Sequence, residues 1–387
     1  MLYLTKLQLQ AELNRCLTCK TQPCMSACPV SCNPQEFIRY AREGEWENAV
    51  HAITRYNPMG QTCGLICPDK FCMKACTRCH VDFPINIPRV QATILNEHRT
   101  QKEGTCGVAP NGFRIAIIGA GPAGMAAAMV LGKSGFCVDI YESRDEVGGA
   151  LNMIPEERLP HSVIEKDWSF IFEPDRMRLL LNSHVEDPAE LCQEYDGVIV
   201  ATGEPNCLAL RIPGEELSVS YMDYLYHPEQ YRTAGCVAVI GGGNVAVDCA
   251  LTAARLGARS VEMFIRRRLV DMRISKKEHM ELLEHKINAN GMMSPEKIEK
   301  NGDLLKLWVR RNMFDGEKWT ALPNSTIALP YFDLVIRAIG SRADEKNESI
   351  PTLIYAGDCK TGGSTIVEAI ASGKNAAEAM IATVLHQ

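Results

Sequence analysis

The sequence predicts an α/β chain in which two parallel-sheet domains, one inserted in the other, follow an α-helical segment rich in cysteine. A strand pattern enters a glycine-rich turn at Gly119 and again at Gly241, and each turn opens a helix pattern. This order is typical of parallel βαβ units. Eleven of the 17 cysteines lie between Cys16 and Cys106. The 387 residues suffice for two or three domains with cores of their own.

The composition excludes several classes of function. The net charge is -6 and the sequence pI is about 5.9, so no positive field is present to attract a nucleic acid or an acidic membrane surface. The N-terminal segment lacks the long apolar core of a signal peptide. No run of about eighteen apolar residues suggests a membrane span. We therefore expect a cytoplasmic chain without nucleic-acid or membrane partners.

Residues 1–110 are expected to form a small α-helical domain with two groups of cysteines. A helical pattern from Pro34 to Tyr56 separates these groups. The groups are Cys16-x2-Cys19-x4-Cys24-x3-Cys28-Pro29 and Cys63-x3-Cys67-Pro68-x3-Cys72-x3-Cys76. Short spacings with proline after a cysteine are typical of iron–sulfur loops, in which several thiolates must meet on one compact cluster. In the related ferredoxin run the last cysteine binds the other cluster, and we expect the same crossing here.

Two alternatives remain open for these cysteines. A pair of four-cysteine zinc sites also uses C-x2-C spacing, although the longer gaps fit such sites less well. Buried free thiols are the other alternative. Two four-ligand clusters need at most eight ligands, so the cysteines in excess are not all expected to bind iron. These are Cys32, Cys63, Cys79 and Cys106.

A dinucleotide-binding segment is expected at residues 111–210. The strand Arg114–Ile118 enters the turn Gly119-Ala120-Gly121-Pro122-Ala123-Gly124 and then a helix. The first glycine permits the tight turn, the second lets the backbone approach a pyrophosphate at the helix N-terminus, and the third lets the helix pack on the strand. A second strand ends at Glu142, where a carboxylate would bind an adenosine ribose.

Glycine-rich loops follow in the same segment. Gly148 and Gly149 precede Arg158 in a stretch that would let the chain pass close to a bound cofactor. A buried strand pattern then ends in Thr202-Gly203. Taken alone, that strand and turn carry no functional signal.

A second dinucleotide-binding domain is expected at residues 211–328. The strand Val237–Ile240 enters a GxGxxA turn, and the next strand, Ser260–Ile265, ends in arginines rather than in a carboxylate. Guanidinium groups at that place can bind a 2'-phosphate, which favours NADPH over NADH. The turn residues are Gly241, Gly243, Asn244, Val245 and Ala246, and the arginines are Arg266, Arg267, Arg268 and, further on, Arg273. The chain therefore binds two dinucleotides, or one of the domains is vestigial.

The remaining residues, 329–387, are expected to complete the first nucleotide domain. A hairpin around Phe314–Gly316 comes before them, and a strand from Phe332 to Ile339 closes in Gly340. A further strand ends in Gly357-Asp358, and a helix of small residues begins near Ser364. A helix N-terminus beside an acid suits a flavin, because the dipole favours electron density on the ring and Asp358 can bond a ribityl hydroxyl.

With these motifs placed, the chain resembles the NADPH-oxidising electron-input half of a flavoprotein family. The family includes dihydropyrimidine dehydrogenase, as its N-terminal portion or as the separate bacterial subunit, and the small subunit of glutamate synthase. The resemblance covers nearly the full length. It includes both cysteine groups, GAGPAG, the GG…IPxxRLP loop, GGGNVAVD and AGD…TIVEAIASGKNAA. It implies two Rossmann-like domains preceded by an α-helical iron–sulfur domain, with FAD, NADPH and two [4Fe-4S] clusters.

The resemblance also implies ligands by position. One cluster would be held by Cys16, Cys19, Cys24 and Cys76. The other would be held by Cys28, Cys67, Cys72 and Gln91, a glutamine whose place matches the pyrimidine branch. Four residues separate Cys67 from Cys72 where the dehydrogenase has five, which is a departure from the family. The cofactor contacts implied besides those of the turns are Val185, Ala338, Gly340, Thr365 and Ile366.

The function implied is transfer of a hydride from NADPH to FAD, followed by passage of single electrons through the clusters to a partner subunit. The partner would be an FMN-containing subunit like that of dihydropyrimidine dehydrogenase, or the large subunit of glutamate synthase, because the substrate-reducing half is missing from these residues. Gln91 and the segment FIRRRLVDMR favour pyrimidine (uracil or thymine) reduction. A glutamate synthase small subunit and a non-catalytic electron carrier are the alternatives.

No catalytic side chain is assigned, because the cofactors carry the hydride step. Disulfide mechanisms are excluded. Thioredoxin reductase carries a C-x2-C pair soon after the second glycine turn, where this chain has Cys249 alone, and glutathione-reductase-like enzymes carry a cysteine pair shortly after the position of Gly149, where this chain has none.

Overall fold

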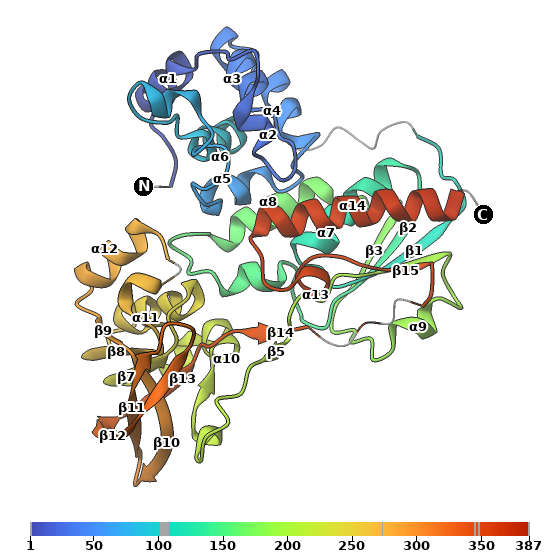
Figure 1. Ribbon diagram of the computed structural model, residues 1–387. Coiled ribbons are helices and arrows are strands. Elements are labelled where there is room, and N and C mark those ends of the chain that lie inside the picture. Colours follow the sequence, from blue (N-terminus) through green and yellow to red (C-terminus); the bar gives the residue numbers. More distant parts are fainter. Residues whose placement is uncertain (1, 101–107, 273, 344–345, 347–348, 386–387) are drawn as a thin grey trace. The chain divides into compact units, whose positions relative to one another are not determined.

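The computed structural model describes residues 2–100, 108–272, 274–343, 346 and 349–385 (Figure 1). The chain divides into two units. Unit 1 comprises Met1–Leu151, Glu156–Pro205 and Ala343–Gln387, and unit 2 comprises Asn152–Pro155 and Asn206–Arg342. The expectation of an α/β fold is confirmed.

Unit 1 begins with a group of helices that carries both cysteine groups. Thr5 caps the first helix through a capping box, and Asn33 caps the helix that begins at Pro34. The pattern predicted as one helix forms two, because Gly44 ends the first of them with φ +80. The helices are α1 (Lys6–Arg15), α2 (Pro23–Ser26), α3 (Pro34–Glu43), α4 (Trp46–Thr54), α5 (Gly60–Ile66), η1 (Thr77–His80) and α6 (Ile87–His98).

The rest of unit 1 is a five-stranded parallel sheet in the order β15-β4-β1-β2-β3. Its strands are β1 (Arg114–Ile118), β2 (Cys137–Tyr141), β3 (Met177–Leu180), β4 (Gly197–Val200) and β15 (Leu353–Tyr355). The helices are α7 (Pro122–Lys133), η2 (Gly149–Met153), α8 (His161–Ile171), α9 (Pro188–Leu191), α13 (Asp358–Thr361) and α14 (Ile366–Leu385). Figure 1 shows α7, α8 and α14 together on one face of this sheet. The edge strand β15 therefore comes from the segment that follows unit 2 in the sequence.

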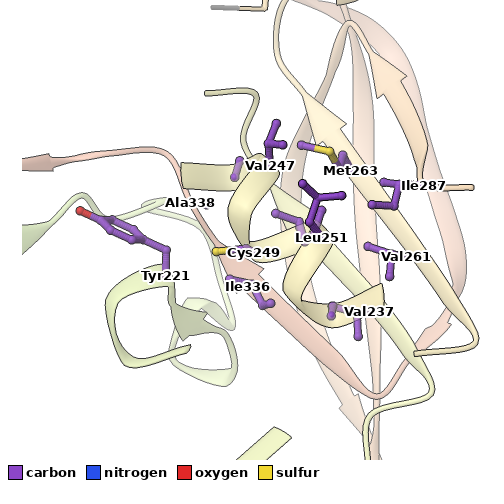
Figure 2. Packing of buried hydrophobic residues seen from close by; sticks show 14 of the residues in the cluster. Tyr221, Val237, Val247, Cys249, Leu251, Val261, Met263, Ile287, Ile336 and Ala338 are labelled. Carbon is purple, nitrogen blue, oxygen red and sulfur yellow. The ribbon is translucent and has the colours of Figure 1, made fainter. Parts of the chain in front are cut away.

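Unit 2 has a parallel sheet in the order β6-β13-β7-β8-β9 and an antiparallel sheet in the order β10-β11-β12. Side chains from β7, α11 and β8 pack with those of β13 in one apolar core (Figure 2). The strands are β5 (Asn206–Cys207), β6 (Val219–Ser220), β7 (Cys236–Ile240), β8 (Ser260–Ile265), β9 (Asn288–Gly291), β10 (Met293–Asn301), β11 (Leu304–Phe314), β12 (Trp319–Phe332), β13 (Leu334–Arg337) and β14 (Ser341–Arg342). The helices are η3 (Glu215–Leu217), α10 (Tyr221–Tyr226), η4 (Pro228–Tyr231), α11 (Asn244–Arg255), η5 (Leu269–Asp271) and α12 (Lys276–Glu284).

The strand predicted from Phe332 to Ile339 differs from its expected place. It is the short β13, which pairs in parallel with β7 and so lies in the sheet of unit 2. Residues 329–342 therefore belong to unit 2 rather than to the segment that completes the other nucleotide domain. Periodicity alone does not distinguish the two assignments, because an apolar strand fits the centre of either parallel sheet.

Candidate functional site

The first glycine turn is shaped by close backbone contacts. Gly119 has φ +104, and a β-carbon there would lie 2.5 Å from the carbonyl oxygen of Ala201. A β-carbon on Gly124 would lie 1.9 Å from the carbonyl oxygen of Gly119. At Gly121 the nearest atom to such a carbon is Cα of Gly149, 3.9 Å away. Two glycines are thus required by the fold, while the middle one leaves open backbone, as a bound pyrophosphate requires.

Residues from distant parts of unit 1 surround the beginning of α7. Glu142 is buried, and its Oε2 accepts the N–H of Ala120 at 2.8 Å. The N–H of Gly148 donates to the carbonyl oxygen of Ala120 at 2.9 Å. Gly357 approaches Ala123 so closely that a β-carbon on it would lie 2.8 Å from that of Ala123. Four of the segments that the sequence singled out for a flavin therefore meet at one helix N-terminus.

The helices that follow the two glycine turns both begin without a side-chain cap. Neither Gly121 before α7 nor Gly243 before α11 offers a side-chain acceptor to the first N–H groups. By contrast, α1, α3, α6 and α12 are each capped by a Thr, Asn or Ser side chain. Uncapped N–H groups at a helix N-terminus are donors for a phosphate. This donor set fits the pyrophosphate of a dinucleotide at each turn.

The C-terminal part of unit 1 places an acid beside the start of α14. Burial raises the pKa of the Asp358 carboxyl, whereas a hydrogen bond from the Ser364 hydroxyl lowers it; burial is the larger effect. The backbone N–H and hydroxyl of Thr365 both donate to Oε2 of Glu368, and Ile366 is the first residue of the helix. A half-buried carboxyl next to a helix N-terminus can accept hydrogen bonds from a polar ligand chain.

The second glycine turn repeats the first. Gly241 has φ +148, and a β-carbon there would lie 2.1 Å from the carbonyl oxygen of Ala338 and 3.1 Å from Cβ of Ala246. A β-carbon on Gly243 would have no atom within 4 Å. Asn244 and Val245 are exposed at the start of α11. Ala338 thus lies at the nucleotide turn of unit 2. The sequence analysis had instead placed it in the segment that completes the other nucleotide domain.

The predicted arginines follow β8. The backbone carbonyls of Arg266 and Arg267 accept hydrogen bonds from Asn312 and Met292, at 3.0 and 2.8 Å. Their guanidinium groups form no ion pair within the described part of the chain. Arg268 differs, because both Asp271 oxygens accept from its guanidinium at 2.8 and 3.0 Å. Arg273 lies outside the described residues.

One pocket brings together the four cysteines expected at the first cluster. Cys16, Cys19, Cys24 and Cys76 all line it. Gln35 also lines it, and its Oε1 is buried without a hydrogen-bond partner in the described residues. The pKa of the Cys24 thiol is raised to about 11, mainly by burial, with smaller contributions from the nearby thiols of Cys16 and Cys76. Thiolates in such a pocket need a bound cationic centre, which an iron–sulfur cluster supplies.

A second group forms around Cys28, Cys67 and Cys72. Burial raises the pKa of the Cys67 thiol above its ordinary range, and neighbouring Cys63 and Cys28 add to this. The same holds for Cys72, whose neighbours are Cys67, Cys28 and Cys24. The three predicted cysteines are therefore neighbours, with Cys72 buried and Cys28 and Cys67 partly buried.

Gln91, the predicted fourth ligand, is buried between Gly60 and Cys32. Its Nε2 donates to the carbonyl oxygen of Gly60 at 2.6 Å, and its Oε1 lies 3.7 Å from Sγ of Cys32. Cys32 was counted among the cysteines in excess. Sequence spacing alone does not indicate this pairing.

All sixteen described cysteines are free, and Cys106 lies outside the described residues. In that same part of the chain, no three His, Cys, Asp or Glu side chains converge to hold a single metal ion. Cys249 is fully buried in the core of unit 2. The thiols are thus arranged neither as disulfides nor as a single-ion zinc site.

The structure gives fewer contacts for the other residues predicted to bind a cofactor. Val185 packs against an apolar cluster that contains Ala116 and Val198 of the unit 1 sheet. Arg158 is half-buried, and Thr202 is exposed before Gly203, which has φ +70. Gly340 has φ +104 and lies beside Leu208 in unit 2. In the described part of the chain, no helix combines the length and the apolar character needed to cross a membrane.

The sequence analysis did not single out three charged residues, Asp167, Arg99 and Lys374. Asp167 on α8 forms a buried ion pair with Arg99 at the end of α6, which joins the cysteine-bearing helices to the nucleotide-binding part of unit 1. Lys374 on α14 donates from Nζ to the carbonyl oxygen of Tyr56 at 2.7 Å. A signal for the first was available: Asp167 shares an apolar helix face with Val163, Ile164 and Ile171, and a carboxylate there needs a partner.

Comparisons with known proteins agree with this arrangement. A family model described as dihydropyrimidine dehydrogenase domain II, 4Fe-4S cluster, matches residues 1–103. A second, described as pyridine nucleotide-disulphide oxidoreductase, matches residues 113–367. Among curated proteins, the NAD-dependent dihydropyrimidine dehydrogenase subunit PreT of Escherichia coli K12 is 31% identical over 396 residues, covering 95% of this chain and 92% of that protein. The glutamate synthase [NADPH] small chain of Azospirillum brasilense is 29% identical over 430 residues, covering 95% and 87%.

Solved structures resemble the fold. FprA of Mycobacterium tuberculosis in complex with NADPH has a TM-score of 0.59 at 20% identity, over 71% of this chain and 85% of that one. Thioredoxin reductase of Lactococcus lactis has a TM-score of 0.54 at 21% identity, over 71% of this chain and the whole of that one. At these identities the likeness concerns the fold alone.

Proposed function

The chain belongs to the pyridine nucleotide-disulphide oxidoreductase family, in the group of NAD(P)H-dependent flavin and iron–sulfur subunits related to PreT and to the glutamate synthase small chain, and from this premise we propose a specific role. It is the NADPH-oxidising, electron-input subunit of a pyrimidine-reducing enzyme. The observation that carries the proposal is the meeting of Glu142, Gly148–Gly149 and Gly357–Asp358 at the N-terminus of α7, in the same unit as the four-cysteine pocket.

The protein's own groups would hold the two coenzymes and orient them. The first N–H groups of α7 would bind the FAD pyrophosphate, Glu142 the adenosine ribose and Asp358 the ribityl chain. The N–H groups of α11 would bind the pyrophosphate of the nicotinamide coenzyme. When bound, FAD accepts a hydride and releases electrons singly, which iron–sulfur clusters can carry onward. Since no side-chain acid or base is needed for this, the protein contributes position and electrostatics.

Two clusters are proposed rather than one. The pocket of Cys16, Cys19, Cys24 and Cys76 would hold the first. The group of Cys28, Cys67 and Cys72 would hold the second, with Gln91 expected from the family as its fourth ligand. Ligation requires deprotonated thiols, and a bound iron atom would stabilise the thiolate that burial disfavours.

The coenzyme is proposed to be NADPH. Arg266 and Arg267 follow β8 with guanidinium groups that are not engaged in ion pairs within the described residues, which suits a 2'-phosphate. The relative PreT is named NAD-dependent, so the two coenzymes must be compared directly on this chain.

The partner is proposed to be an FMN-containing subunit that reduces uracil or thymine. The relative that supports it is named a dihydropyrimidine dehydrogenase subunit. The second candidate is a large amidotransferase subunit of glutamate synthase, supported by the identity to the glutamate synthase small chain.

The test is an anaerobic titration of the reconstituted holoprotein with NADPH and, separately, with NADH. Flavin absorbance, iron–sulfur absorbance and EPR are followed together. We expect NADPH to donate more electrons than one flavin can hold, with EPR signals of reduced clusters. If neither NADPH nor NADH reduces the protein, the nucleotide site is degenerate and the proposal is wrong.

The partner is tested with the reduced holoprotein. It is mixed with an FMN-containing pyrimidine-reducing subunit and uracil, or with a glutamate synthase large subunit, glutamine and 2-oxoglutarate. Dihydrouracil is the expected product. Formation of glutamate alone would replace the first candidate by the second.

A further inference from the structure

The four-cysteine pocket also contains a glutamine that the cluster assignment does not use. Gln35 is the second residue of α3, directly after Pro34, and it lines the pocket together with the cysteines. Its Oε1 is buried without a hydrogen-bond partner, and its Nε2 has no partner in the described part of the chain either. A buried polar atom without a partner destabilises a fold. The amide of Gln35 is therefore available to whatever binds in the pocket.

The other polar side chains of the pocket wall are already engaged by the protein. Besides the cysteines themselves, these residues and their partners are Thr77 with Cys19, Gln22 with Asn33, and Arg78 with Asp82. Among the polar side chains that line the pocket, Gln35 alone thus lacks a partner within the residues that the structure describes. This difference singles out its amide as the group that can respond to a bound cluster.

Apolar side chains form much of the remaining wall. Ile38, Ile85 and Ile87 line the pocket and are only 1%, 2% and 3% exposed. Ile38 lies one turn after Gln35 on α3, so the glutamine stands beside a surface from which water is excluded. A hydrogen bond is electrostatically stronger in such surroundings than in water. A single donor in this pocket can therefore have a measurable effect.

An iron–sulfur cluster presents hydrogen-bond acceptors and no donors. Its sulfur atoms carry negative charge, and hydrogen bonds to them help to set its reduction potential. A glutamine amide has two N–H donors, and rotation about its last bond exchanges the oxygen with the nitrogen. Beside sulfur the orientation that presents an N–H group is favoured, because the same charge repels Oε1. The chemistry of the Gln35 amide thus fits the group that the four cysteines would hold.

We propose that Gln35 donates an amide N–H to a sulfur atom of the cluster in the four-cysteine pocket and thereby raises the reduction potential of that cluster. The hydrogen bond strengthens when the cluster takes up one electron, because its sulfur atoms become more negative. No bond to iron forms or breaks and no proton is transferred. The electron is the one that the proposed flavin delivers. This inference deepens the proposed function and rests on it.

The test is an anaerobic potentiometric titration of the reconstituted full chain, followed by EPR. Gln35→Leu removes both donors, so reduction of one cluster should become about tenfold less favourable, which is about 59 mV for one electron. Gln35→Glu has the shape of the wild type but places a carboxylate there, and it should lower the same potential at least as far. The other cluster should keep its potential. Gln10→Leu is the matched control, because that exposed glutamine on α1 donates to Asn14, and it should change neither potential.

The inference is overturned if neither variant of Gln35 shifts a potential, if the shift is upward, or if both clusters shift together. Iron content and circular dichroism are measured for each variant. If Gln35→Leu does not fold, Gln35→Glu decides, because an acid in the first turn of a helix is favourable. A wild type that holds no cluster, or that NADPH does not reduce, would instead refute the proposed function. Clusters that form and are reduced normally, with potentials that do not respond to Gln35, would refute this inference alone.

Discussion

Arg99 and Asp167 form an ion pair that is almost entirely removed from water, with 5% and 0% of their side chains exposed. The second carboxylate oxygen of Asp167 accepts the N–H of Thr62 at 2.9 Å, and Arg99 also donates to Oε1 of Gln61 at 2.8 Å. One carboxylate on α8 thus binds the end of α6 and the start of α5. It joins the cluster-bearing helices to the flavin-binding part of unit 1.

Asp167→Ala is therefore expected to be strongly destabilising. It leaves the Arg99 charge buried without a partner, which costs about 3–5 kcal/mol. Urea unfolding of the apoprotein measures the loss. The double variant Arg99→Met, Asp167→Leu should recover much of it, because an apolar pair needs no compensation. As a surface control, Glu43→Ala, which breaks an exposed pair with Arg39, should change stability by less than about 0.5 kcal/mol. A small effect of Asp167→Ala would show that water or another group reaches Arg99.

Gly121→Val is expected to abolish flavin binding while keeping the fold. The residue has φ -81, which any amino acid adopts, and open space in place of a side-chain neighbour. A valine would occupy the place of the pyrophosphate, so the flavin content of the purified protein should fall by at least about tenfold, or 1.4 kcal/mol.

Gly243→Val is the reciprocal control. The corresponding position of unit 2 has no atom within 4 Å of an added β-carbon. This variant should retain its flavin and lose NADPH binding, as measured by calorimetry on the holoprotein. If each variant lost both ligands, the separate assignment of the two turns would be wrong.

The double variant Arg266→Ala, Arg267→Ala is expected to weaken NADPH selectively. A charge-assisted hydrogen bond to phosphate contributes about 1.5–3 kcal/mol, so KM for NADPH should rise by about tenfold or more while KM for NADH stays the same. Arg268→Ala is the matched control, because Asp271 already binds that guanidinium and the 2'-phosphate should lose nothing. Equal weakening of the two coenzymes would remove the argument for NADPH.

Asp139 on β2 is expected to make stability depend on acid pH. Burial raises the pKa of its carboxyl, but hydrogen bonds from Arg178, Tyr195 and Arg114 outweigh that effect and bring the pKa below its ordinary value of 3.8. Because the folded-state pKa is the lower one, the carboxylate stabilises the fold above pH 3.8, and this contribution disappears as the pH falls through the folded-state pKa.

Asp139→Asn should consequently lower the apparent Tm at pH 7, and its difference from the wild type should shrink below about pH 4. Differential scanning calorimetry between pH 3 and pH 7 measures this. Asp303→Asn, an exposed carboxylate in the turn between β10 and β11, should leave the profile unchanged. A pH-independent difference for Asp139→Asn would show that the hydrogen bonds contribute without the charge.

The sequence was sufficient for features that local chemistry determines. Both glycine turns and the strands before them follow from the need for a tight turn and open backbone, and their bounds agree with β1 and β7 to within a residue. The four-cysteine pocket joins Cys76 to Cys16, Cys19 and Cys24, a set that spacing suggested and family resemblance assigned. The break between α3 and α4 was missed, although Gly44 is a typical C-cap residue and was a signal for it.

Features that depend on which distant segments come into contact could not be predicted from the sequence. The strand after Phe332 is equally apolar in either sheet, and only its pairing with β7 places it in unit 2. The contact of Gln91 with Cys32 joins residues that are far apart in the sequence and depends on the orientation of both side chains. The spacing of residues in the sequence does not predict such an orientation. Lys374 falls in a helix of small residues with no local sign that it reaches Tyr56.

The division of unit 1 by an inserted unit has a consequence for biosynthesis. The edge strand β15, Gly357, Asp358 and α14 follow unit 2 in the chain, although they complete a sheet and a site begun before it. Domains generally fold as units while the ribosome is still adding residues. Unit 2 can fold once residue 342 has emerged from the ribosome. The flavin site is incomplete until α14 has been synthesised. Flavin is therefore expected to bind only after α14 has been synthesised, and flavin starvation should leave unit 2 already folded.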